Sequence, residues 1–97
     1  MVSVKITPSD QGSKRYKAVF TNDDGKKILT RHFGYKGGST YIDHKDDKIK
    51  NAWIARHSVR GNFEDYKSAS SLAYHILWRF KSFNEAVRSY KNKFNLS

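Results

Sequence analysis

Apolar and polar residues alternate in three short runs within the first third of the chain. Residues 2–6 alternate strictly, as in a strand with one buried face. Residues 16–21 and 27–33 are rich in aromatic and β-branched side chains, which favour strands. Residues 22–25 (Asn-Asp-Asp-Gly) form a strong turn signal, because glycine tolerates positive φ and the Asn and Asp side chains bond nearby backbone. We therefore predict a three-stranded antiparallel meander with one covered face.

The rest of the chain has helical periodicity. A first helix is expected over residues 46–60, where Ile49 and Trp53 are four residues apart and share one face with Ala52 beside them. A second helix is expected over residues 68–78, the most apolar segment and therefore the expected core of the domain.

A third helix is expected to begin at Ser82, because Glu85 follows three residues later in the spacing of a capping box. Apolar residues then repeat at spacings of four, three and four, which gives the helix one amphipathic face. These residues are Phe83, Val87, Tyr90 and Phe94.

The fold class predicted from this order is α+β, a three-stranded antiparallel meander followed by three α-helices in a single domain over residues 1–97. The sheet occupies residues 1–33, a Gly-rich loop residues 34–45 and the helical part residues 46–97.

The Gly-rich loop places Lys36 among three glycines, Gly34, Gly37 and Gly38. The spacing matches neither a Walker loop nor a dinucleotide-binding fingerprint. The loop is either a phosphate-approaching segment, with Lys36 as its cation, or a flexible connector from sheet to helix, and the connector is favoured.

Charge points to an anionic partner. The 97 residues include 19 Lys and Arg against 9 Asp and Glu, for a net charge of +10. Residues 48–97 hold ten of the basic and three of the acidic side chains, so most of the excess positive charge lies in the helical half.

Cysteine is absent, which excludes zinc fingers, iron–sulfur clusters and thiol nucleophiles. No apolar run is long enough for a transmembrane helix, and the first residues do not resemble a secretory signal, so we expect a protein that is not secreted.

Metal-dependent catalysis finds little support in the sequence. The four histidines are far apart, and no pair has the spacing of ligands on one helical turn. Asp43, Asp46 and Asp47 form an acidic cluster near His44, which a magnesium-dependent nuclease could use. Helix capping explains these carboxylates better, because they crowd the start of one expected helix. We therefore expect a non-enzymatic protein without metal or cofactor, and the nuclease is a minor alternative.

A basic stripe on the first expected helix is the most informative feature. Arg56 and Arg60 are four residues apart, and Trp53 and His57 share the adjacent stripe. Such a stripe can lie along a phosphate backbone, or it can be an ordinary surface over a buried Trp53. The candidate nucleic-acid-binding residues are Lys36, Lys48, Lys50, Trp53, Arg56, His57, Arg60, Arg79 and Arg88.

The order of several segments resembles a group of small uncharacterised proteins of nucleocytoplasmic large DNA viruses, the giant viruses of algae and amoebae. The segments are Tyr16-Lys17-Ala18-Val19-Phe20, Phe33-Gly34-x-x-Gly37, Tyr41-Ile42-Asp43-His44-Lys45-Asp46, Ile54-Ala55-Arg56-His57 and Leu72-Ala73-Tyr74-His75-Ile76-Leu77-Trp78. The chain departs from that group where it has Phe63 and Tyr66-Lys67 in place of a Trp and a Pro. The resemblance implies a viral context and assigns no catalytic residue.

Two functions are consistent with these features. The first is a non-enzymatic nucleic-acid-binding protein that contacts the phosphate backbone through a basic helical face during genome packaging or condensation, with DNA favoured over RNA. The alternative is a small structural component of the virion, a minor capsid or scaffold protein that binds other viral capsid proteins. Either function places the protein in the virion or in the cytoplasm or nucleus of the infected host cell.

Overall fold

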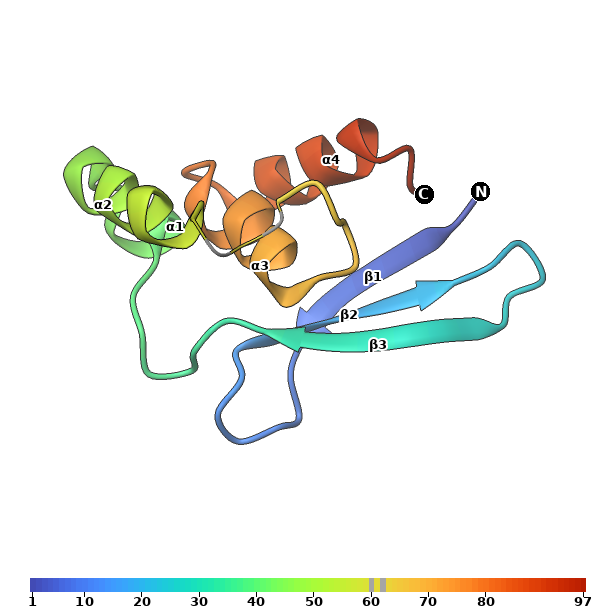
Figure 1. Ribbon diagram of the computed structural model, residues 1–97. Coiled ribbons are helices and arrows are strands. Elements are labelled where there is room, and N and C mark those ends of the chain that lie inside the picture. Colours follow the sequence, from blue (N-terminus) through green and yellow to red (C-terminus); the bar gives the residue numbers. More distant parts are fainter. Residues whose placement is uncertain (60, 62) are drawn as a thin grey trace.

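The computed structural model describes residues 1–59, 61 and 63–97 and contains the predicted three-stranded antiparallel sheet, with helices after it (Figure 1). The strands lie in chain order, β1 (Ser3–Pro8), β2 (Tyr16–Thr21) and β3 (Lys27–Phe33). The first strand begins one residue later and ends two residues later than the alternating run suggested. The α+β class is confirmed.

The turn between β2 and β3 is closed by Asn22. Its side-chain oxygen accepts hydrogen bonds from the backbone N–H groups of Asp24 and Lys26, both at 3.0 Å. Gly25 has a φ of +80°, a conformation in which a side chain would be strained. This confirms the predicted turn.

Among the described residues, the helical part contains, in chain order, α1 (Tyr41–His44), α2 (Asp47–His57), α3 (Ala69–Leu72), η1 (Ala73–Trp78) and α4 (Phe83–Lys93). α3 and η1 follow without a break and together form the expected second helix, with Ser68 as its N-cap. η1 is π-helical, a wider turn that the sequence pattern did not predict. α4 begins after its N-cap Ser82, as predicted.

The helix α1 lies inside the segment that we expected to be an irregular loop, so that expectation is wrong for residues 41–44. Thr40 and Asp43 form a capping box at its start, and Lys45 ends it with a left-handed φ of 57°. The Thr-x-x-Asp spacing was visible in the sequence as a capping signal.

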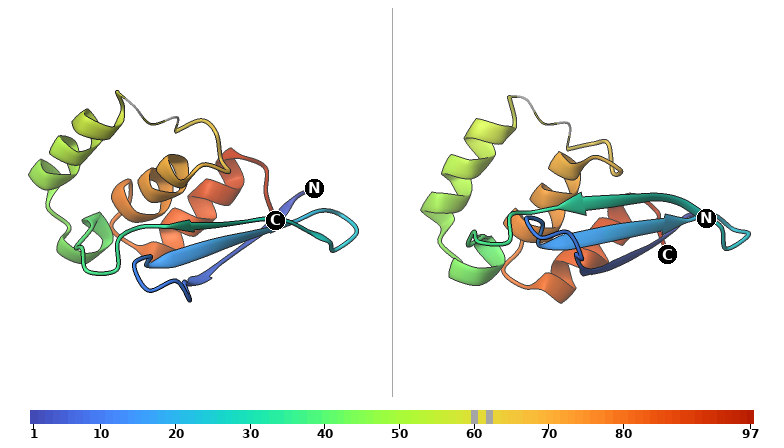
Figure 2. Two further views of the ribbon diagram at one scale, coloured as in Figure 1. Left: turned by 60° about the horizontal axis from the view of Figure 1, so that its bottom comes forward. Right: turned by 90° about the horizontal axis from the view of Figure 1, so that it is seen from below.

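Helices cover one face of the sheet, and the core lies between the two layers (Figures 1 and 2). Phe20 and Phe33 from the sheet are buried with Leu72, Ile76 and Leu77 from the α3–η1 helix. The last four residues of η1 are all buried, and η1 contacts α1, α2 and α4. The most apolar segment is therefore the core, as predicted.

The segment between α2 and α3 is tied to the core by hydrogen bonds. The Phe63 carbonyl accepts from the Ser71 hydroxyl and from Nε2 of His75, each at 2.9 Å. The Tyr90 hydroxyl donates to the Tyr66 carbonyl. His75 is thus a buried packing residue, and burial lowers its pKa so that the neutral ring is favoured.

The helix α2 lies beyond the end of the sheet rather than over it (Figures 1 and 2). None of its side chains is fully buried, and its nearest neighbours are α1 and η1. Ile49 and Trp53 were expected to share one face, but Ile49 is 47% exposed, whereas Trp53 is half-buried against the core. The partly buried side chains of α2 are those of Lys50, Trp53 and Ile54 instead.

We expect Ile76→Ala to lower the free energy of unfolding by about 2–5 kcal/mol, because it removes buried methyl groups and leaves a cavity. Ile28→Ala is the matched control, since Ile28 is 49% exposed, and it should change the free energy by less than about 0.5 kcal/mol. Urea unfolding at neutral pH measures both variants. Equal losses in the two variants would contradict the placement of the core.

Candidate nucleic-acid interface

Trp53 is the centre of a set of near-parallel aromatic rings. Its ring centroid lies 4.0 Å from His57 and 4.9 Å from Trp78, with interplanar angles of 15° and 10°. Phe63 is parallel at 6.2 Å, and Phe63 in turn stacks on Tyr74 at 4.4 Å. Stacked rings in these geometries stabilise a contact beyond the area they bury. Trp53 therefore joins α2 to η1 by packing against the core.

Lys50 has a structural role as well. Its ammonium donates to the Arg79 carbonyl at 3.0 Å and lies 4.5 Å from the centre of the Tyr41 ring. This contact brings the Arg79 backbone next to the start of α2, so the structure places these two predicted residues together.

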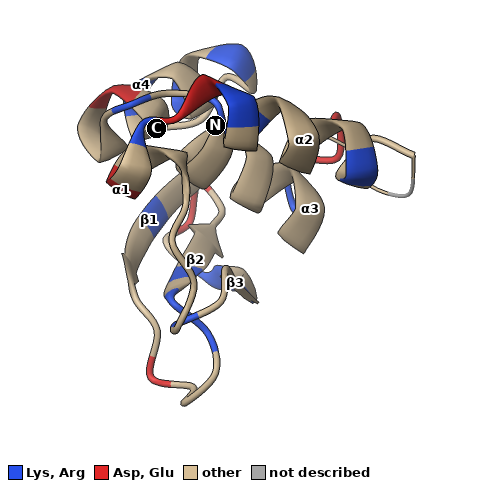
Figure 3. Cartoon of the chain, turned by 90° about the vertical axis from the view of Figure 1, so that its left-hand side faces the viewer, with Lys and Arg blue, Asp and Glu red and all other residues tan. Residues whose placement is uncertain are grey.

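The remaining cations of α2 are exposed. Lys48 and Arg56 lie in its first and last turns, and both side chains are accessible to solvent. Figure 3 shows basic segments near both ends of α2, with acidic residues close to the first. Among the residues that the structure describes, the side chains of Arg15, Lys17 and Lys93 and the N-terminal ammonium of Met1 form ion pairs with carboxylates. In this part of the chain, no carboxylate forms an ion pair with Lys36, Lys48, Arg56 or Arg79.

His57 is exposed at the end of α2. Its Nδ1 lies 2.9 Å from the Trp53 carbonyl. Because a carbonyl only accepts, Nδ1 carries the proton in this bond, and Nε2 of the neutral ring is an acceptor.

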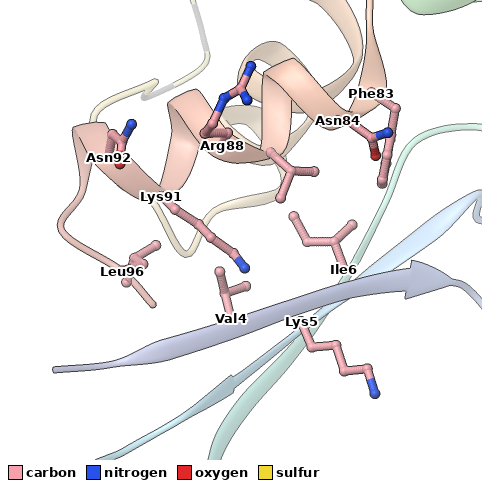
Figure 4. Close-up of a pocket in the computed structure, with 10 residues that line it drawn as sticks. Val4, Lys5, Ile6, Phe83, Asn84, Arg88, Lys91, Asn92 and Leu96 are labelled. Carbon is pink, nitrogen blue, oxygen red and sulfur yellow. The ribbon is translucent and has the colours of Figure 1, made fainter.

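Arg88 does not belong to this surface. It lies on α4 and borders a separate groove of about 520 Å³ between α4 and β1. Figure 4 shows Lys91 reaching over Val4 in that groove, while Arg88 and Lys5 point away from it. Arg60, also predicted as a site residue, lies outside the described residues.

A second groove, which we call the aromatic groove, lies between the Gly-rich loop, α2 and the α3–η1 helix. It has a volume of about 360 Å³. Its lining includes Tyr35, Thr40, Trp53, His57, Ala73 and Trp78, with Lys14 also at its border. The sequence did not reveal this groove, because its lining residues come from several separate segments between Lys14 and Trp78. It brings the Gly-rich loop next to the predicted α2 residues.

The glycines of the loop position Tyr35. The Tyr35 ring lies so close to Gly37 and Gly38 that Cβ atoms there would stand 3.3 and 3.5 Å from it. Gly34 has a φ of +79° and approaches Leu77 closely. The Lys36 and Gly38 N–H groups already donate to carbonyls of Ser13 and Tyr35. Two of the N–H groups that a phosphate-cradling loop would offer are therefore already bonded within the protein.

The acidic cluster is held by contacts within the protein. Asp43 forms a two-point ion pair with Arg15, at 2.6 and 2.7 Å, and accepts from the Thr40 N–H and hydroxyl. Asp46 is the N-cap of α2 and accepts from the Lys48 and Ile49 N–H groups, and Asp47 accepts from the Tyr41 hydroxyl. The favoured capping interpretation is confirmed for Asp46.

These contacts lower two carboxyl pKa values. The Arg15 guanidinium is the main cause for Asp43, whose pKa falls far below its usual range although partial burial opposes the change. The Tyr41 hydroxyl lowers the pKa of Asp47, and the charges of Lys81 and Lys50 add to the effect. In the part of the chain that the structure describes, no group of three or more His, Cys, Asp or Glu side chains is arranged to hold a metal ion.

Together, the fold and this site define a small α+β domain that sets a basic helix beside an aromatic groove. Residues 4–57 match the model of the family of unknown function DUF5754, and the chain belongs to that family. It is also 42% identical over 83 residues to the uncharacterised protein L851 of Acanthamoeba polyphaga mimivirus, an alignment that covers 77% of this chain and 80% of the relative. No solved structure matches the chain.

The resemblance to uncharacterised giant-virus proteins is thereby confirmed. The matched residues extend from β1 to the end of α2, so they include the Gly-rich loop, α1 and the Trp53–His57 pair. In addition, no helix among residues 1–59, 61 and 63–97 has the length and apolar character to cross a membrane.

We expect Arg15→Gln to weaken the fold at neutral pH and to flatten its response to acid. The pKa of Asp43 is lower in the folded chain than in the unfolded chain, so its contribution is present above about pH 4 and is lost as the pH falls. Urea unfolding of both proteins between pH 7 and pH 2.5 measures this difference. Parallel pH curves for the two proteins would show that the ion pair does not contribute as described.

Proposed function

We propose that this protein binds nucleic acid without catalysis, by placing α2 along the phosphate backbone of DNA. The observation that carries the proposal is the exposed pair Lys48 and Arg56 in a chain with a net charge of +10. Neither cation forms an ion pair with a carboxylate of the residues that the structure describes. Each cation that neutralises a phosphate releases bound counterions, so such a surface gains affinity without reading the sequence.

The geometry of α2 suits a backbone contact. Lys48 and Arg56 are eight residues apart, which is about 12 Å along a helix axis. The exposed residues between them include Ala52 and Ala55, whose small side chains allow close approach. Arg79 follows η1 next to α2, where its carbonyl accepts from Lys50, and Lys36 lies in the Gly-rich loop that borders the aromatic groove.

Because phosphate contacts position a protein without specifying bases, we infer a general role such as packaging or condensing a viral genome. The viral relative supports that setting. We place the protein's action in the virion or in the infected cell.

Binding of a labelled 30-base-pair duplex at 50, 100 and 200 mM salt tests the proposal by fluorescence anisotropy. We expect a Kd in the micromolar range at low salt and a straight log–log salt plot with a slope between about −2 and −4, since three or four cations are involved. Arg56→Gln should weaken binding and reduce the slope by about one.

Lys26→Gln is the matched control. It removes the same charge from the turn between β2 and β3, at the opposite end of the molecule from α2 (Figure 1). Equal effects of the two variants would contradict a role for α2 and leave only non-specific attraction by net charge. No binding at 50 mM salt would reject the proposal and favour the alternative, a structural virion protein whose exposed Ile49 and Val59 contact other proteins.

A further inference from the structure

We propose that the aromatic groove binds an unpaired nucleobase, so that the protein prefers single-stranded over double-stranded nucleic acid. This inference rests on the proposed function and deepens it, because it names the ligand that lies next to α2. The groove volume of about 360 Å³ is in the size range of small-molecule sites and is large enough for a planar base.

The lining offers stacking surfaces from two separate elements. Tyr35, from the Gly-rich loop, is 69% exposed, and its ring lies close to Gly37 and Gly38. His57, from α2, is exposed and lies on Trp53, which is itself stacked on Trp78. Aromatic rings on facing elements bind bases of any sequence, since every base has a π-face.

Polar groups at the groove suit a nucleotide. Because Nδ1 of His57 is engaged by the Trp53 carbonyl, its Nε2 can bond a base edge or a phosphate. Lys14 borders the groove, and its described lining contains no Asp or Glu. The site therefore attracts an anionic chain and does not repel it at close range.

A path for the phosphates continues from the groove. His57 also borders a second hollow, together with Arg56, Val59, Gly61 and Ser70. A base bound beside His57 thus has its backbone next to Arg56, the cation that the proposed function already requires. Bases in a duplex are stacked and paired, and extruding one costs free energy, so the groove favours strands whose bases are already free.

Intrinsic fluorescence reports on this groove directly. The chain has two tryptophans, Trp53 and Trp78, and both line the groove. A stacked base should quench their emission. The test titrates the protein with three labelled 20-mers, a single-stranded oligothymidylate, its duplex with oligoadenylate and an abasic strand that keeps every phosphate, following both anisotropy and tryptophan emission.

We expect the single strand to bind about tenfold more tightly than the abasic strand and to be the only ligand that quenches tryptophan emission strongly. Tyr35→Ala should remove most of that tenfold difference and leave duplex and abasic binding unchanged. Ile28→Ala removes an exposed apolar side chain from β3 and should change none of the three affinities.

The outcomes separate the two proposals. If the abasic strand and the duplex bind with salt dependence but the single strand gains nothing, the base site is rejected and backbone binding stands. If only the single strand binds and Tyr35→Ala abolishes it, the base site stands and the backbone proposal fails. If no ligand binds at 50 mM salt, both are rejected.

Discussion

The contact between the rings of Trp53 and Trp78 fixes where α2 lies. α2 buries none of its side chains fully and extends beyond the sheet, so it lacks the wide apolar face that normally attaches a helix to a core. In its place, two stacked indoles and the Lys50 contact with the Arg79 carbonyl join α2 to η1 and to the segment after it. The positions of Lys48, Arg56 and His57 relative to the Gly-rich loop all follow from this attachment.

The same attachment explains why some aromatic residues pack within the protein while others are exposed to a ligand. Trp53 faces the core and is covered by neighbouring rings, so its stacking capacity is largely used within the protein. The outward-facing aromatic surfaces are His57, which continues the stack, and Tyr35, which the glycines of the loop hold in place. An inner stack of packed rings with two exposed rings at its border is preorganised for binding. Few side chains would have to become ordered when a ligand binds, so the entropic cost of binding is low.

Local patterns predicted much of the fold because several elements depend on short-range signals. The strict alternation before Pro8, the Asn22–Gly25 turn and the Ser82 N-cap each act within a few residues. α1 was missed because its glycine-rich approach resembles a loop, and its capping Asp43 is fixed by Arg15, a partner from the segment before β2. Tertiary contacts also decided which side of α2 faces inward. Helical periodicity placed Ile49 on the inward side, but Ile49 is exposed and the Lys50 side chain is bonded to the Arg79 carbonyl instead. The site was predictable only in part, since the sequence singled out the residues of α2 and Lys36 but not the groove with Tyr35 that lies between them.

Hydrogen exchange of the α2 amides in Trp53→Ala tests most directly whether the Trp53 stack positions this helix. The account predicts that exchange over residues 47–57 becomes about tenfold faster or more, while the amides of β2 keep their protection. Ile49→Ala is the matched control on the same helix, because Ile49 is largely exposed, and it should leave α2 protection close to that of the unmodified chain. Unchanged protection of α2 in Trp53→Ala would contradict the account, since the helix would then be held by contacts other than the stack.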